Sequence, residues 1–129
     1  MVDVAGGVTN PATVDARGTL HTYINGINNS DYQDAFNTFT TDSDAYQGGL
    51  DTWAEGQSTT YIVDALITGV RDIDLETIEV DMNFTSFQTA EYGPSGQTCT
   101  EWQLAYEMVG SGPNWLIRKA TPIVAPVGC

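Results

Sequence analysis

The chain has 129 residues, of which 41% are hydrophobic and 10% aromatic, enough for one domain with its own core and too few for two. It carries 17 acidic residues against four basic ones, and the net charge of −13 disfavours binding to nucleic acid and to anionic membranes. No apolar stretch approaches the roughly 20 residues that span a bilayer, and residues 1–7 lack the regions of a signal peptide, so we expect a soluble chain without membrane insertion.

The first twelve residues are expected to precede the fold. They are small and polar and contain Asn10-Pro11, which is typical of a flexible segment. Thr13, directly after them, can cap a helix. We therefore predict a flexible lead-in over residues 1–12 and a single domain over residues 13–129.

Three helical segments are predicted in the first half of this domain. In the first, apolar residues recur at helical spacing until Asn28-Asn29-Ser30 breaks the pattern. Ser30 or Asp31 can cap a second, short helix. The third segment covers residues 43–55, although Gly48-Gly49 in its middle weakens its helical character.

After Gly56 the hydrophobic period changes to two, which predicts strands. A turn at residues 71–74 would pair Tyr61, Val63, Ala65 and Ile67 with Phe84, Met82, Val80 and Ile78. A turn near residues 93–96 would place Phe84, Met82 and Val80 opposite Leu104, Tyr106 and Met108. All these residues share one apolar face, so we predict an α+β domain whose N-terminal helices cover an antiparallel sheet.

A fourth strand is predicted from about Trp115 to Ile123, and its two faces are similar in character. A shift of one residue decides whether Arg118 points into the core or out of it. An inward Arg118 could hold an anionic group of a ligand, whereas an outward one would pair with a neighbouring acid.

Cys99 and Cys129 are the only cysteines, and with a single histidine the chain does not supply the ligands of a zinc site. Either register of the fourth strand brings Cys99 near residues 124–125, and residues 125–128 could turn Cys129 back toward it. We therefore expect a disulfide and an oxidising, extracellular or cell-surface setting. If the protein is exported, its signal or anchor has been removed upstream.

The stretch from Tyr23 to Phe36, followed by the strands Trp102 to Val109 and Trp115 to Ile117, resembles the NTF2-like (SnoaL-like) superfamily, in particular its secreted bacterial members. The resemblance covers residues 13–123. It implies a cone in which the helices close over a strongly curved antiparallel sheet, often with an apolar pocket at the open end. It also implies that a homodimer could form through the sheet.

The resemblance implies catalysis only where acid and base groups stand on the wall of the cone. Ketosteroid-isomerase-like members use a carboxylate with tyrosine-type donors, dehydratase-like members a histidine with a carboxylate, and epoxide-hydrolase-like members an Asp/Arg/Asp set. The inward face predicted above contains no Asp, Glu or His, so a general base on the wall is missing.

We therefore predict a non-catalytic domain without cofactor or metal, which binds a small apolar or amphipathic ligand or a protein partner. The alternative is a SnoaL-like isomerase or cyclase acting on a small polyketide-like or steroid-like substrate, with His21 and tyrosines as its polar groups. The aspartate-rich segments 42–44 and 72–76 do not have the spacing and glycine of a calcium loop, and we interpret them as helix caps and turns.

The candidate pocket residues each have an alternative structural role. His21 borders the apolar stripe of the first helix and could look into the cone or be a half-buried hydrogen-bonding residue. Aromatic side chains could supply pocket walls and hydroxyl tips or simply fill the core. The predicted ligand-binding residues are His21, Tyr23, Trp53, Tyr61, Met82, Tyr106 and Arg118.

Overall fold

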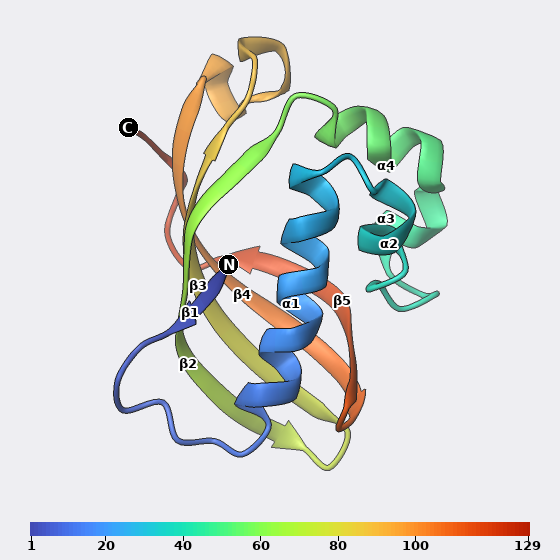
Figure 1. Cartoon of the computed structure of the whole chain (residues 1–129), viewed down its shortest axis with the longest axis vertical. Helices are drawn as coiled ribbons and strands as arrows, with labels where there is room; N and C mark the ends of the chain where they lie inside the picture. The colour runs from blue at the N-terminus through green and yellow to red at the C-terminus, as the bar shows by residue number, and fades with distance from the viewer.

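The computed structural model describes residues 1–129 and shows one long helix lying across a curved sheet, with three short helices beside it (Figure 1). The sheet order is β1-β2-β3-β4-β5, and β6 pairs with β4. None of the helices combines the length and apolar character needed to cross a membrane. The elements are β1 (Val2–Val4), α1 (Thr13–Asn28), α2 (Tyr32–Phe36), α3 (Asp44–Gly48), α4 (Leu50–Gln57), β2 (Tyr61–Asp74), β3 (Thr77–Phe87), η1 (Ala90–Tyr92), η2 (Pro94–Gly96), β4 (Cys99–Ser111), β5 (Asn114–Pro122) and β6 (Val127–Gly128).

The first residues, expected as a flexible lead-in, take part in the fold. Strand β1 pairs in parallel with β2, and the side chain of Val2 is completely buried. Arg17 on α1 donates a hydrogen bond from Nε to the carbonyl of Val2 at 2.5 Å. The structured part of the chain therefore begins earlier than the sequence predicted.

The helices begin and end close to the predicted positions, with one different cap. Thr13 is the first residue of α1 rather than its cap, and Ala12 occupies the capping position without a side-chain hydrogen bond. Ser43 caps α3 by accepting a hydrogen bond from the Tyr46 backbone. The third predicted helix is divided into α3 and α4 at Gly49, whose φ of +90° is a conformation that glycine adopts readily.

The β2–β3 hairpin is longer than predicted and its register differs. Strand β2 continues to Asp74, so the turn lies at residues 75–76 instead of 71–74, and Ile67 pairs with Met82 rather than Ile78. The pairing is also interrupted between Val63 and Leu66, where Asp64 has a φ of +57°. This bulge inserts an unpaired residue and changes which side chains of β2 face inward.

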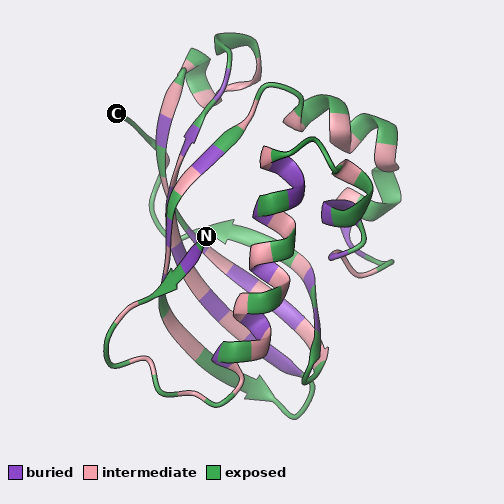
Figure 2. Cartoon of the chain, viewed as in Figure 1, coloured by how far each residue is buried: buried purple, intermediate pink, exposed green.

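Strands β3 and β4 pair without interruption, and their register differs from the prediction by two residues. Phe84 lies opposite Trp102 and Met82 opposite Leu104. Because side chains alternate with a period of two, the predicted inward face is nevertheless correct. Figure 2 shows the buried positions recurring along the strands behind α1.

The fourth predicted strand, β5, turns Ile117 into the core and Arg118 outward. Arg118 donates from Nε to Glu107 Oε2 at 2.6 Å on the neighbouring strand β4. The outward alternative is therefore the correct one, and Arg118 is not a pocket residue.

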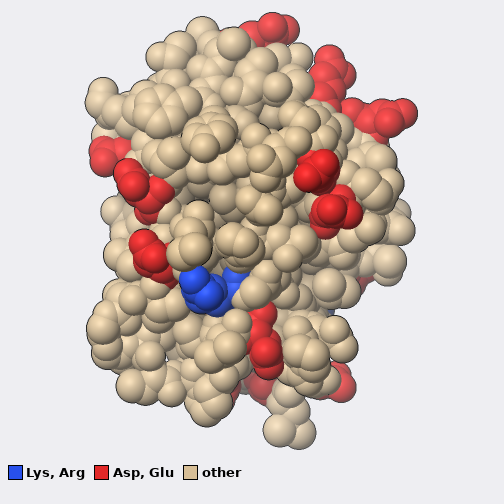
Figure 3. Space-filling view, in the orientation of Figure 1, with Lys and Arg blue, Asp and Glu red and all other residues tan.

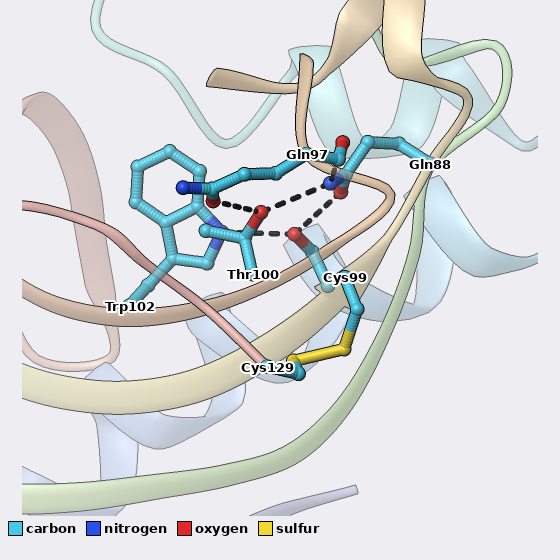
Figure 4. The surroundings of a disulfide bond; sticks show 7 residues. Gln88, Gln97, Cys99, Thr100, Trp102 and Cys129 are labelled. Atoms are coloured by element: carbon cyan, nitrogen blue, oxygen red, sulfur yellow. Dashed lines mark hydrogen bonds between the residues drawn. A yellow bond between two sulfur atoms is a disulfide. The ribbon is translucent and has the colours of Figure 1, made fainter. Parts of the chain in front are cut away.

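The predicted disulfide between Cys99 and Cys129 is confirmed (Figure 4). Beside it, β6 pairs antiparallel with the start of β4, and the Cys129 amide donates to the Cys99 carbonyl at 3.1 Å. The bond thus ties the last residues of the chain to the sheet.

Two glycines of α1 should respond oppositely to alanine. A Cβ at Gly26 would lie 2.7 Å from the Ala35 Cβ, because α2 packs closely there, whereas a Cβ at Gly18 would meet nothing within 4 Å. We expect Gly26→Ala to lower the free energy of unfolding by about 1 to 3 kcal/mol through overpacking. Gly18→Ala should raise it by about 0.5 to 1 kcal/mol through helix propensity. Urea unfolding measures both, and equal effects would contradict the close helix contact.

Removing the disulfide should destabilise the fold. The two cysteines are 30 residues apart, and closing such a loop stabilises a protein by about 3 to 4 kcal/mol in the chain-entropy model. The double variant Cys99→Ser/Cys129→Ser should show this loss in urea unfolding. A reductant should destabilise the wild type similarly and leave the variant unchanged; a variant as stable as the oxidised protein would contradict the expectation.

Candidate functional site

A cavity of about 440 Å³ opens at the end of the sheet that α1 does not cover. Its rim is formed by the end of α4 and by the segment of η1 and η2, which lie toward the top of Figure 1. Its walls come from the first residues of β2, the last of β3 and the first half of β4. Tyr23 of α1 and Ala120 of β5 complete the lining.

The walls of the cavity are mainly apolar. Phe84 and Trp102 lie opposite each other on β3 and β4, with ring centroids 6.1 Å apart and planes at 21°. Ile62 and Leu104 add aliphatic surface. Such walls favour an apolar ligand because each square ångström of apolar surface removed from water contributes about 25 cal/mol.

Two tyrosines, Tyr23 and Tyr106, line the inner part of the cavity with ring centroids 6.5 Å apart. Neither hydroxyl makes a hydrogen bond within the protein, yet the only buried side-chain polar atom without a partner is Oγ1 of Thr13. The two hydroxyls are therefore open to the cavity. They are groups that a ligand could pair with.

Both tyrosines stay protonated over a wide pH range. Burial raises the pKa of Tyr23 from 10.0 to about 12. Burial also raises the pKa of Tyr106 well above 10.0, and the nearby Tyr23 adds to this effect. Near neutral pH both groups are uncharged hydroxyls that can donate a hydrogen bond to an oxygen of a ligand.

A buried polar network supports one wall of the cavity (Figure 4). Ser86 accepts from Trp102 Nε1 at 2.8 Å and donates to Gln88 Oε1 at 2.6 Å. Gln88 Nε2 in turn donates to Thr100 Oγ1 at 3.0 Å and to the Gln97 carbonyl at 2.9 Å. Because Ser86 and Gln88 pair within the network, it holds the Trp102 ring in place.

The only charged residue that lines the cavity is Glu91, on η1 at the rim. Elsewhere the surface is acidic, and Figure 3 shows carboxylates spread over one face with basic groups confined to one small area. No group of three or more His, Cys, Asp or Glu side chains is placed to hold a metal ion.

Two of the seven predicted pocket residues, Tyr23 and Tyr106, line the cavity. Trp53 instead packs between Tyr23 and Phe39, with ring centroids at 6.2 and 5.5 Å, in an aromatic cluster under the short helices. Met82 is completely buried in the core. These two residues support the site without reaching the cavity.

The remaining candidates lie outside the cavity. Tyr61 is 53% exposed, because the bulge at Asp64 turns Ile62 inward in place of Tyr61 and Val63. His21 is half-buried on α1 and is not part of the lining. Arg118 pairs with Glu107 on the outer face, as described above.

The polar part of the wall was not predicted from the sequence, although a signal was present. The inward positions of β3 recur at every second residue up to Phe84, and the same alternation continues to Ser86 and Gln88. Polar residues at consecutive inward positions at the end of an apolar strand indicate where a core gives way to a site. The rim residues Glu91 and Tyr92 lie on η1, in a segment without such a pattern.

No family model and no curated protein matches the sequence. Solved structures are similar over most of their length. A conserved protein from Planctomyces limnophilus has a TM-score of 0.66 at 13% identity, covering 92% of this chain and 100% of that chain. A domain of unknown function with a cystatin-like fold from Nostoc punctiforme has a TM-score of 0.64 at 10% identity, covering 88% and 76%. A ketosteroid isomerase-like protein from Erwinia carotovora atroseptica has a TM-score of 0.59 at 18% identity, covering 90% and 99%.

These likenesses confirm that the chain has the NTF2-like fold, with α+β architecture and helices on a curved sheet. At such low identity they establish the fold alone.

The two cavity tyrosines should make stability depend on alkaline pH. A tyrosine whose pKa is raised in the folded state ionises first in the unfolded chain. Its contribution to the free energy of unfolding is therefore fully present below pH 10.0 and is lost as pH rises toward 12. The free energy of unfolding should fall across this window, and Tyr23→Phe should make the fall shallower. Urea unfolding across this pH range tests this, with Tyr61→Phe, outside the cavity, as the control. An unchanged slope for Tyr23→Phe would contradict the buried environment.

Proposed function

We propose that the protein is an extracytoplasmic binding domain for a small, largely apolar molecule that carries a hydrogen-bond-accepting oxygen. The observation that carries the proposal is the pair of unpartnered hydroxyls of Tyr23 and Tyr106 in an apolar cavity of about 440 Å³. Cavities of this size, with apolar walls and a few convergent polar groups, are typical of small-molecule sites.

The polar groups of the cavity differ in their availability. The side chains of Ser86 and Gln88 are paired in the network, so they shape the wall. The hydroxyls of Tyr23 and Tyr106 are unpaired, and a hydrogen bond from a neutral donor typically contributes about 0.5 to 1.5 kcal/mol. A carbonyl or ether oxygen seated between them would therefore orient the ligand in the cavity.

The disulfide supports the extracytoplasmic setting, since such bonds persist in oxidising compartments and are rare in reducing ones. Thr100 and Trp102 of the network follow Cys99 of the disulfide on β4, and these bonds give the site a rigid wall before any ligand binds. Preorganisation of this kind lowers the entropic cost of binding.

The enzymatic alternative has weaker support. It assigned its polar groups to His21 and tyrosines, and of His21, Tyr61 and Tyr106 only Tyr106 lines the cavity. The one carboxylate in the lining, Glu91, lies at the exposed rim, whereas a general base acts within hydrogen-bond reach of its substrate proton. We therefore propose binding without catalysis; a homodimer through the sheet stays a prediction.

The test uses two probes of the same shape. In 2-isopropenylnaphthalene a CH₂ group replaces the carbonyl oxygen of 2-acetylnaphthalene. Isothermal titration calorimetry should show the ketone binding about tenfold more tightly, because it alone satisfies the tyrosine hydroxyls. Tyr106→Phe and Tyr23→Phe should each reduce this preference several-fold, whereas Tyr61→Phe should preserve it.

Two outcomes would contradict the proposal. One is that neither naphthalene binds the folded, oxidised protein. The other is that both bind equally well and the ratio is the same in all three tyrosine variants, which would mean that the hydroxyls make no contact with the probe.

A further inference from the structure

We propose that the natural ligand of the cavity is an organic cation, whose apolar body lies against the aromatic walls and whose positive group lies at the rim beside Glu91. This inference rests on the proposed binding function and names the ligand class. Three properties of the cavity carry it: the sign of its only charge, the absence of any basic residue, and its aromatic lining.

Each of the four basic residues of the chain is placed away from the cavity. Arg17 binds the Val2 carbonyl, Arg71 pairs with Glu79 and Asp81, and Arg118 pairs with Glu107. Lys119 precedes the lining residue Ala120 on β5, and strand alternation directs the two side chains to opposite faces.

An anionic ligand would therefore lose its hydration without gaining a counter-charge. It would also approach a protein of net charge −13, whose field repels anions and attracts cations. A cationic ligand meets the opposite situation, because Glu91 is a carboxylate at the opening and no basic group competes for it.

The aromatic lining adds a second favourable contact. Trp102 and Tyr92 both border the cavity, and a quaternary or protonated nitrogen over an aromatic face is attracted by the ring quadrupole, most strongly for Trp. The Trp102 ring is held by its hydrogen bond to Ser86, so it can present a fixed face. Tyr92 directly follows Glu91 on η1, which brings a carboxylate and an aromatic ring together at the rim.

The experiment compares three ligands with one naphthylmethyl body. One carries a trimethylammonium group, one the uncharged tert-butyl group of the same shape, and one a sulfonate. Isothermal titration calorimetry should show the cation binding about tenfold more tightly than the tert-butyl compound. The sulfonate should bind more weakly than either, and added salt should reduce the preference for the cation.

Two variants locate the charge effect. Glu91→Gln should weaken binding of the cation by about threefold and leave the tert-butyl compound unchanged. Glu101→Gln is the matched control: it makes the same change in net charge at an exposed position of β4, outside this cavity. It should leave the cation affinity close to that of the wild type.

The outcomes separate this inference from the proposed function. If the tert-butyl compound binds and the cation binds no more tightly, the cavity is a site for neutral ligands and the inference is overturned. If Glu91→Gln and Glu101→Gln weaken binding of the cation equally, the inference is overturned as well. The cation would then respond to the net charge of the protein and not to a contact with Glu91 at the rim. If none of the three compounds binds but 2-acetylnaphthalene does, the inference is overturned and the proposed function stands; if 2-acetylnaphthalene fails to bind as well, both fail.

Discussion

The uninterrupted pairing of β3 with β4 is the constraint on which the rest of the structure depends. It runs from Thr77 opposite Val109 to Phe87 opposite Cys99 without a bulge, whereas the pairings of β2 with β3 and of β4 with β5 each contain irregularities. One continuous inward face results. Its lower part is apolar and covered by α1, and its upper part carries Ser86 and Thr100 beyond the end of the helix. Core and cavity are therefore two parts of the same surface.

The end of α1 determines where helix side chains no longer cover the inward face of the sheet. Asn28, the last residue of the helix, accepts from the Ile62 amide at 2.7 Å and donates to the Ile62 carbonyl at 2.8 Å. Its side chain thus takes the place of a neighbouring strand at the start of β2. The chain then turns tightly into α2, which packs against Gly26. Because the helices leave the sheet at this point, the space above Tyr23 and Tyr106 remains open.

The polar network and the disulfide give this open end its rigidity. A cavity lined by unpaired polar groups tends to collapse or to fill with water, but here the side chains of Ser86, Gln88 and Thr100 bind one another. Gln97 extends the network to Thr100 and also lies against Gly128, one residue before Cys129. The wall that carries Trp102 is thereby connected to the end of the chain. This arrangement keeps the walls in place and leaves the hydroxyls of Tyr23 and Tyr106 free for a ligand.

The amino-acid sequence by itself determined the order of the main helices and strands, the weak point at Gly48-Gly49 in the third helical segment, the inward face of β3 and β4, and the disulfide. The helices, the strands and the inward face follow from local periodicity and turn residues, which act over short stretches of sequence. The disulfide follows because two cysteines allow only one pairing. The tertiary structure alone decided the hairpin registers, the bulge at Asp64, the role of β1 and the composition of the cavity. Register depends on how whole faces pack against α1, and one extra residue in β2 was enough to exchange Tyr61 for Ile62 at the wall. The cavity depends on residues from eight elements that no local pattern brings together.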